Sequence, residues 1–312
     1  MSVMRWNYAA GFLVSAGMPL CAMELAEPTR ADLFSVRGRL EQNLGYDTNP
    51  TLGDQRSAGR THAIQPDNFS HTRASLNVAC RDVPLAIRGS ADCLEYFHEH
   101  KFSNDTVEGE FSAPWQATDS TTLTPLALLE HEWVGHKDYQ NTTKAAMHWE
   151  QEWDSAWTTE VTPSFSHIAY VAPNQGLSGH DRDVQSAITW WVPGQQLLAS
   201  LEGNASLTSF VADNQKNDYQ AGTIGIDADW RLPLKFDLET SAIWGSTDYD
   251  QADANGVYRL DHLFTVAVIL QRPVLTWLAV TLGVEHTSLN SNIPGNSYIQ
   301  TQEYLGFIAH GF

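Results

Sequence analysis

The residue types best suited to chemistry in this sequence are carboxylates that recur at every second position. The run AMHWEQEWDSAWTTEV begins at Ala146 and ends at Val161. Its even positions include His148, Glu150, Glu152 and Asp154, and its odd positions include Met147, Trp149, Trp153 and Trp157. Because successive side chains of a strand point to opposite faces, the acids would share one face and the tryptophans the other. A row of carboxylates in contact with water attracts cations and repels anions, so this pattern predicts selection by charge.

Several other segments carry the same alternation of charged and apolar residues. We therefore expect pore-lining residues on one face of the strands and lipid-facing tryptophans on the other. The expected pore-lining set is Arg37, Arg39, Glu41, Glu150, Glu152, Asp154, Glu202, Asp227, Asp229, Asp237 and Glu239. The expected lipid-facing set is Trp149, Trp153, Trp157, Trp230 and Trp244, with Trp149 and Trp157 toward the membrane interfaces and Trp153 nearer mid-membrane. An alternative stays open, in which the mixed charges pair with one another and only make the wall rigid.

Histidine spacing does not predict a metal centre. In LEHEWVGH, which runs from Leu129 to His136, the second histidine comes one residue too late after His131. The helical zinc motif needs its two histidines four positions apart on one face. His98 and His100 alternate onto one side of a strand end and could bind a transition metal weakly, but solvated loop side chains are the favoured interpretation.

Acidic loops and hydroxyl side chains give no stronger signal. The loops from Asp47 to Asp54 and from Asp248 to Gly256 are rich in oxygen ligands. Neither has the calcium spacing of a helix–loop–helix site, and turn chemistry is the favoured interpretation. No spacing singles out a serine beside a base. The sequence therefore predicts no catalytic residue, no metal, no cofactor and no enzymatic activity.

Composition and the N-terminus bound the class of protein. The chain has 312 residues and a formal net charge of −19, which argues against a nucleic-acid partner. Arg5 precedes an apolar run from Tyr8 to Leu20, the layout of a secretory signal peptide. We expect this signal over residues 1–26, with its cleavage point open. A lipoprotein signal at Cys21 and a buried N-terminal helix are the alternatives. No later run of about eighteen apolar residues predicts a membrane-spanning helix.

Nearly every segment after residue 27 shows strand periodicity, and the connections alternate in length. Short turns are expected near residues 82–84, 119–121, 162–164, 193–195, 232–234 and 271–273. Longer loops are expected near residues 48–67, 98–106, 136–143, 173–183, 212–218, 246–256 and 288–297. This alternation is typical of an antiparallel up-and-down transmembrane β-barrel, here of about fourteen strands over residues 27–312. An even strand number places both ends on the short-turn side. A soluble β-sandwich with the tryptophans in its core is the alternative.

Two cysteines fall within the expected barrel. With a turn centred near Val83 and Pro84, Cys80 would pair with about Ile87, and Cys93 would lie beyond disulfide reach. We expect two small apolar side chains facing lipid. A different strand register would still allow a bond.

Two short motifs carry family resemblances. The chain ends in EYLGFIAHGF, where Tyr304, Ile308 and Phe312 share one face. This strand resembles the C-terminal strand that barrel-insertion machinery recognises in Gram-negative outer-membrane proteins, apart from His310 at a usually apolar position. The run LEQNLGYDTNPTLGD, from Leu40 to Asp54, resembles the first strand of putative β-barrel porins. It is also similar to the C-terminal barrel of surface lipoprotein assembly modifiers, in which a helical repeat domain normally precedes the barrel. Both resemblances imply a barrel in the bacterial outer membrane.

The first functional hypothesis is a porin-like channel for passive diffusion of ions and small solutes, weakly selective for cations. A second is the barrel component of a protein or polysaccharide export or surface assembly system. A third is a non-conducting structural or adhesive barrel. The expected partners are the lipid bilayer, the barrel-insertion machinery and small solutes, without nucleic acid. The oligomeric state and the identity of the solute are left open.

Overall fold

The computed structural model describes residues 34–50, 66–80, 83–172, 174–194, 197–213, 217–252, 256–293 and 295–311. Contacts divide the chain into Met1–Leu33 and Phe34–Phe312, and all described residues belong to the second unit. The expected signal peptide and Phe312 lie outside the described residues. Within the described part of the chain, no helix has the length and apolar character needed to cross a membrane.

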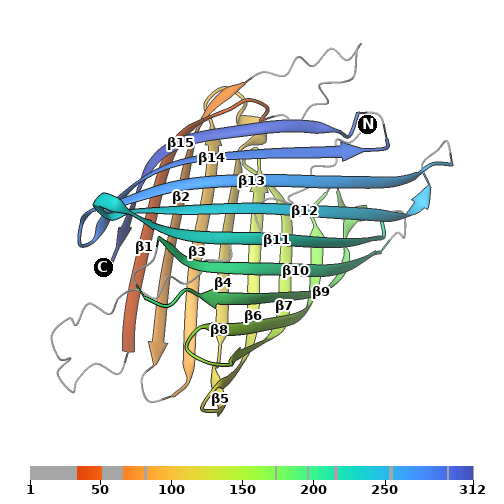
Figure 1. Cartoon of the computed structure of the whole chain (residues 1–312). Helices are drawn as coiled ribbons and strands as arrows, with labels where there is room; N and C mark the ends of the chain where they lie inside the picture. Colours follow the sequence, from red (N-terminus) through yellow and green to blue (C-terminus); the bar gives the residue numbers. More distant parts are fainter. Residues whose placement is uncertain are drawn as a thin grey trace. The chain divides into compact units, whose positions relative to one another are not determined.

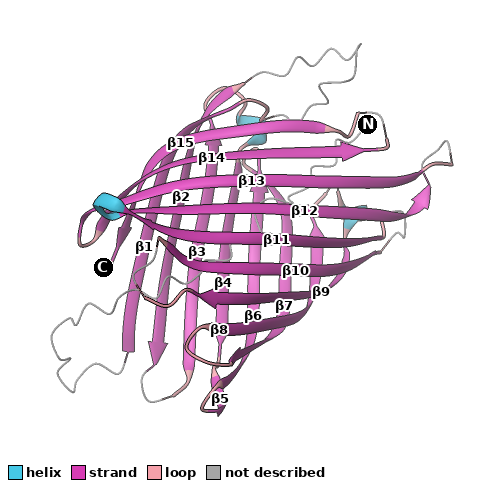
Figure 2. Cartoon of the chain, in the orientation of Figure 1, coloured by secondary structure: helices cyan, strands magenta, loops and turns pink. Residues whose placement is uncertain are grey.

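Fifteen strands make up one antiparallel sheet in the described residues (Figures 1 and 2). The strands are β1 (Phe34–Asp47), β2 (Asp67–Cys80), β3 (Leu85–Tyr96), β4 (Asn104–Ser112), β5 (Trp115–Thr118), β6 (Thr121–Val134), β7 (Lys137–Glu152), β8 (Trp157–Tyr170), β9 (Gly179–Trp191), β10 (Leu198–Ala212), β11 (Tyr219–Leu232), β12 (Phe236–Ala252), β13 (Tyr258–Leu275), β14 (Leu278–Ser291) and β15 (Tyr298–His310). Three short 3-10 helices, η1 (His100–Phe102), η2 (Gln175–Leu177) and η3 (Pro233–Lys235), lie in the connections.

The sheet closes on itself. β1 pairs with β15 along nine residues from Arg39 to Asp47, and β4 pairs with β6. The four-residue β5 pairs only with β6 at the turn that leads into it, so fourteen strands form the closed wall. The predicted fold class, an antiparallel barrel of about fourteen strands, is confirmed. Within this fourteen-strand wall of described residues each strand is paired on both sides, so the strands satisfy each other's backbone groups.

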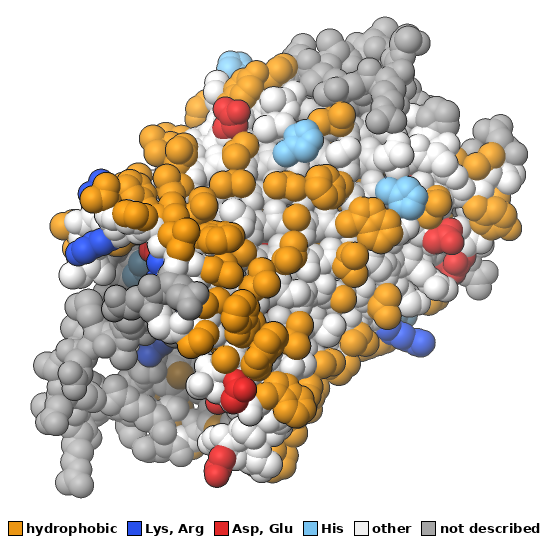
Figure 3. All heavy atoms as spheres, in the orientation of Figure 1, with side chains coloured by type: hydrophobic (Ala, Val, Ile, Leu, Met, Phe, Trp, Pro, Cys, Tyr) orange, Lys and Arg blue, Asp and Glu red, His pale blue; other side chains and the backbone are white. Residues whose placement is uncertain are grey.

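The two faces of the sheet have opposite chemistry. Leu207 is 70% exposed while its neighbour Ser206 is 5% exposed, and Leu44 is 58% exposed beside Asn43 at 2%. Hydrophobic side chains cover much of the outer surface in Figure 3. Apolar residues outside and polar residues inside are the reverse of a soluble core, and they match a wall that contacts lipid. The soluble sandwich alternative is therefore wrong, because the tryptophan face is not a core.

The unbroken alternation of residues 145–161 predicts one long strand, but the structure divides this stretch into two strands and a turn. β7 ends at Glu152, a turn covers residues 153–156, and β8 begins at Trp157. The Asp154 side chain makes this turn, since its Oδ1 accepts the N–H of Ala156 at 2.7 Å and of Trp157 at 3.0 Å. A short polar residue that bonds the backbone two positions on favours a turn over a strand.

The turn predicted near Thr162–Ser164 is also wrong, because those residues lie inside β8. Pro163 has no N–H to donate, and the β7–β8 ladder omits the pairs that would oppose Thr162 and Pro163. His148 spans this gap with a hydrogen bond of 2.9 Å between its Nδ1 and the Thr162 hydroxyl. Pro163 therefore interrupts one ladder without ending the strand.

Two further connections differ from expectation. The loop expected over residues 136–143 is a two-residue turn, Gly135 and His136, with φ of 57° and 60°. Positive φ at both positions matches the twist of a tight hairpin. The turn expected near residues 271–273 falls inside β13, which extends to Leu275. The cysteine register is shifted by two residues from expectation, because Cys80 pairs with Leu85 and Ile87 pairs with Val78. Both thiols are free, and Cys93 stands opposite Thr72 rather than near Cys80.

Candidate functional site

The inner wall of the barrel is the candidate functional site. We define it as the polar face of the closed sheet. Side chains from strands that are not neighbours meet on this face, because it is concave. Tyr96 on β3 donates to the Asp47 carboxylate on β1 at 2.6 Å, and the Thr281 hydroxyl on β14 donates to Asn43 Oδ1 on β1 at 3.4 Å.

One sector of the inner wall, on β1 to β3, pairs its charges. Glu41 is 8% exposed and accepts from Arg39 at 3.2 Å, while Arg73 lies 3.9 Å away. Arg73 Nε also donates to Asp92 Oδ2 at 2.8 Å, and His71 lies 2.7 Å from the same carboxylate. This sector therefore matches the hypothesis that mixed charges hold the wall rigid.

A second sector, on β10 to β12, is different. We call Glu202, Asp227, Asp229, Asp237 and Glu239 the acidic strip. In the strand register Glu202 stands opposite Asp227, and Asp229 stands opposite Glu239. Like charges placed directly opposite each other are destabilising in a sheet. Neutral donors support them: Thr189 donates to Glu202 at 3.0 Å, Asn204 to Asp227 at 2.6 Å, and Ser200 to Asp229 at 2.6 Å.

No Lys, Arg or His among the described residues forms an ion pair with any carboxylate of the acidic strip. Arg231 stands opposite Asp237 in the register without reaching ion-pair distance. The inner wall thus has one charge-paired sector and one sector without ion pairs among the described residues, in which Glu202, Asp227 and Asp229 accept hydrogen bonds from neutral donors.

The remaining predicted pore residues have varied surroundings. Glu150 stands opposite Glu160 on β8, whose carboxylate lies 3.9 Å from His148. Arg37 stands opposite Asn77 and is exposed near the start of β1. Glu152 is exposed at the end of β7. Asp154, expected on a strand facing the lumen, instead bonds the backbone of its own turn.

Sequence reasoning missed many inner-wall acids. They lie on β4, β6, β8, β9 and β14: Glu108, Glu110, Glu130, Glu132, Glu160, Asp181, Asp183 and Glu285. Glu108 stands opposite Glu130. The signal was present, since Glu130 and Glu132 alternate with Leu129 and His131, but the apolar face of β6 is interrupted by histidine and proline and its period is weak.

The expected lipid-facing tryptophans are not equivalent. Trp244 is 46% exposed on β12 and stacks on His262 with ring centroids 6.0 Å apart. Trp157 stacks on Trp190 at 6.1 Å. Trp230 Nε1 donates to the Thr240 hydroxyl at 3.2 Å. Trp153 is 65% exposed in the β7–β8 turn, so its expected mid-membrane position is wrong. Trp149 lies on β7, opposite Leu123 and Val161.

The motif at the end of β1 forms a buried hydrogen-bond network. Asp47 and Asp67 stand opposite each other where β1 ends and β2 begins, and they are 0% and 3% exposed. Besides Tyr96, the Asp47 carboxylate accepts from Gln300 at 2.6 Å and Gln302 at 2.9 Å. Asn49 Nδ2 donates to the Ile299 carbonyl at 2.9 Å. The residues from Tyr46 to Asn49 therefore join β1 to β15 and β3, and Asp47 has a structural role.

The C-terminal strand places Tyr304 and Ile308 on one face, the inner wall. The Tyr304 ring lies against Gly283 of β14, where no Cβ would fit. Ile308 is 5% exposed, whereas Leu305 and Phe307 on the other face are 59% and 40% exposed.

Comparison with known proteins gives this barrel a family. A family model described as surface lipoprotein assembly modifier matches residues 81–308. The chain belongs to the surface lipoprotein assembly modifier family. The assembly modifier match covers the strands from β3 into β15, and it agrees with the family resemblance although the first-strand motif that carried it precedes the matched residues. No curated protein matches the chain at a significant level.

Solved structures similar to this assembly modifier are outer-membrane proteins. The anion-selective porin from Comamonas acidovorans has a TM-score of 0.50 at 9% identity, covering 89% of this chain and 99% of that chain. The OmpT loop-deletion variant of Vibrio cholerae has a TM-score of 0.49 at 8% identity, covering 90% and 100%. OpdK from Pseudomonas aeruginosa has a TM-score of 0.47 at 8% identity, covering 89% and 99%. At these identities the likeness concerns the fold. The assembly modifier is an outer-membrane β-barrel, as the sequence predicted.

Proposed function

We propose that this assembly modifier takes part in placing a lipoprotein on the cell surface, and that the cargo polypeptide passes along the inner wall of its barrel. The family match across residues 81–308 carries the proposal. It favours the second hypothesis of the sequence analysis over a purely passive channel, and it narrows export to a protein cargo. No catalytic step is part of this role.

The dimensions of the barrel limit the form of the cargo. Fourteen strands about 4.8 Å apart and tilted about 40° give a backbone diameter of about 28 Å. Inner-wall side chains reduce the free width to about 10–15 Å. A single helix, about 10–12 Å across, or a thinner extended chain fits within this width. A folded domain of about 100 residues has a radius of gyration of about 13 Å, so its diameter exceeds the free width. The cargo would therefore pass before it folds.

Deleting the gene and labelling the cell surface tests this role. Intact wild-type, deletion and complemented cells are treated with a membrane-impermeant biotin reagent, and labelled lipoproteins are quantified against their total amount. We expect at least one lipoprotein to lose its surface label in the deletion strain while its total amount stays the same, with recovery on complementation. Unchanged labelling of every lipoprotein would contradict the role.

A second candidate function is a water-filled pore with a preference for cations, and the acidic strip favours it. Its carboxylates have no ion-pair partner among the described residues, so their charge would act on ions in the lumen. Planar-bilayer recording of the refolded barrel under a salt gradient tests this function. A cation-preferring reversal potential would support it, and an inserted, heat-modifiable barrel without conductance would exclude it.

We also propose that the insertion machinery binds β15.

A further inference from the structure

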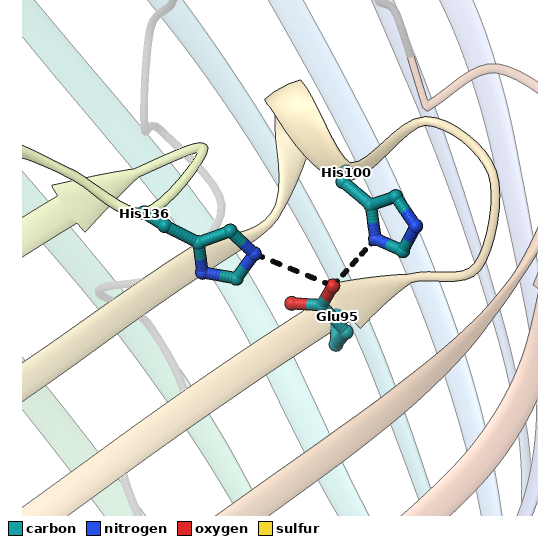
Figure 4. Close-up of side chains that lie close together, drawn as sticks. All are labelled: Glu95, His100 and His136. Atoms are coloured by element: carbon teal, nitrogen blue, oxygen red, sulfur yellow. Dashed lines mark hydrogen bonds and ion pairs between the residues drawn. The ribbon is translucent and has the colours of Figure 1, made fainter.

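A cluster outside the inner wall brings together three side chains that have the chemistry of a metal site. Glu95 is the penultimate residue of β3, His100 begins η1, and His136 occupies the turn between β6 and β7. One ligand atom from each lies within 4.8 Å of the other two. Figure 4 shows both imidazole rings directed at the Glu95 carboxylate. We propose that Glu95, His100 and His136 bind a divalent transition-metal ion of the Zn²⁺ class.

The distances are close to those of a filled site. Zinc binds imidazole nitrogen at about 2.0–2.1 Å and carboxylate oxygen at about 2.0–2.2 Å, so tetrahedral ligands lie about 3.4 Å apart. Glu95 Oε1 is 3.5 Å from His136 Nε2, which already has this spacing. It is 2.7 Å from His100 Nδ1, a hydrogen bond that opens by under 1 Å when the proton between these atoms is replaced by a metal ion.

A fourth residue lies near one of the ligands. His136 directs Nε2 to Glu95, and its other ring nitrogen, Nδ1, lies 3.7 Å from Asp105 Oδ2, which is beyond hydrogen-bond distance. Histidine ligands of zinc commonly place the second nitrogen against a carboxylate, which fixes the ring and raises its basicity. Asp105 on β4 is therefore the carboxylate that would take this position with a small movement when the ion binds.

The backbone holds the two histidines together. His136 has a φ of 60°, a left-handed conformation that costs a non-glycine residue free energy. The preceding Gly135 packs against the backbone of Lys101, where an added Cβ would lie 2.9 Å from the carbonyl oxygen. Its N–H also donates to the Ser103 carbonyl at 2.8 Å. The turn that carries His136 is therefore fastened to the loop that carries His100.

The types of the three ligands indicate which class of metal ion binds, and their exposure lets the ion reach the site. Two imidazoles and one carboxylate suit Zn²⁺ and similar transition metals, whereas Ca²⁺ and Mg²⁺ prefer oxygen ligands alone. The side chains of His100 and His136 are 57% and 58% exposed, so the ion can enter from solvent and a water molecule can complete the coordination. The site lies at the barrel end where β1 finishes and β2 begins, since β3 pairs there with β2 through Tyr96 and Phe69.

Zinc binding to the untagged full chain, refolded in detergent, tests the proposal. Calorimetry with ZnCl₂ should show one site that CaCl₂ does not fill. Glu95→Gln and His136→Asn should each weaken that site at least tenfold, and His100→Ala combined with His136→Asn should abolish it. Asparagine tolerates the left-handed turn, so the fold is preserved. The matched control His286→Gln removes a histidine on β14 that bonds Thr301, and it should leave the site unchanged.

Two results would overturn the metal site. One is a wild-type chain that takes up no zinc. The other is equal zinc affinity for the wild-type chain and the double variant. Heat-modifiable migration on gels checks that each variant is folded, and Glu95→Gln serves alone if the turn variants do not fold. Co²⁺ absorption provides a second readout, because tetrahedral nitrogen and oxygen ligation gives intense visible bands that the double variant should lack.

Discussion

Replacing Asp229 by asparagine should reduce the cation preference of the conducting barrel. Asn keeps the shape of the side chain and can still accept the hydrogen bond that Ser200 donates at 2.6 Å. Only the negative charge is lost. A unit charge about 4 Å from a passing ion contributes about 1 kcal/mol in water. Since about 1.4 kcal/mol is a tenfold ratio, the local cation excess should fall by up to about fivefold.

Salt provides an internal check on this prediction. The Debye length is about 10 Å at 0.1 M and about 3 Å at 1 M. The reversal potential measured across a KCl gradient should therefore shift clearly toward zero at about 0.1 M for Asp229→Asn and shift little near 1 M. Glu303→Gln is the matched control, because Glu303 is exposed on the outer face of β15. Identical reversal potentials for wild type and Asp229→Asn at low salt would refute the placement of the acidic strip in the conducting path.

Three further predictions concern stability, each measured by denaturant unfolding of the refolded barrel. Leu207→Lys, at a 70% exposed outer position within β10, should lower the free energy of unfolding in lipid by about 2–4 kcal/mol. Trp153→Lys in the β7–β8 turn should lower it by about 0–1 kcal/mol. Equal losses for the two variants would contradict the assignment of the outer face. Asp47→Ala should lower the free energy of unfolding by at least about 2 kcal/mol, because Tyr96, Gln300 and Gln302 lose a buried acceptor. Asp248→Ala on β12 is the control. Unchanged stability of Asp47→Ala would show that the three donors find other partners. Asp154→Ala should lower the free energy of unfolding by about 1 kcal/mol, because it removes two turn hydrogen bonds. A changed reversal potential together with an unchanged free energy of unfolding would mean that Asp154 faces the lumen.

The alternation of side chains was sufficient to predict the barrel and the chemistry of most strands. Strand period two is a property of the backbone, so Glu202, Asp227 and Glu239 could be assigned to one face without knowing which strands pair. The strand ends were harder to place. Pro163 inside β8 indicates a turn when only the sequence is known, and the Asp154 turn is hidden within an unbroken alternation. Both errors arise because local hydrogen bonding decides where a strand stops.

Contacts between distant segments could not be predicted from spacing. The sequence groups His136 with His131, where the zinc spacing fails, and groups His100 with His98, so it does not bring His100 and His136 together. Only the turn at Gly135, packed on the loop of η1, brings them to the same carboxylate. Likewise, the separation of the inner wall into a charge-paired sector and the acidic strip depends on register, which places Arg73 beside Glu41 and Asp227 beside Glu202. Composition alone gives only the net charge.

Photo-crosslinking from neighbouring positions on β10 tests directly whether the cargo lipoprotein passes along the inner wall. A photoreactive amino acid is introduced at Ser206, which is 5% exposed on the inner wall, or at Leu207, which is 70% exposed on the outer face. Cells expressing each variant are irradiated, and crosslinked lipoproteins are identified by mass spectrometry. We expect the lipoprotein whose surface label depends on this barrel to be crosslinked from position 206 and not from position 207. Crosslinking of that lipoprotein from position 207 alone, or from neither position, would contradict passage along the inner wall.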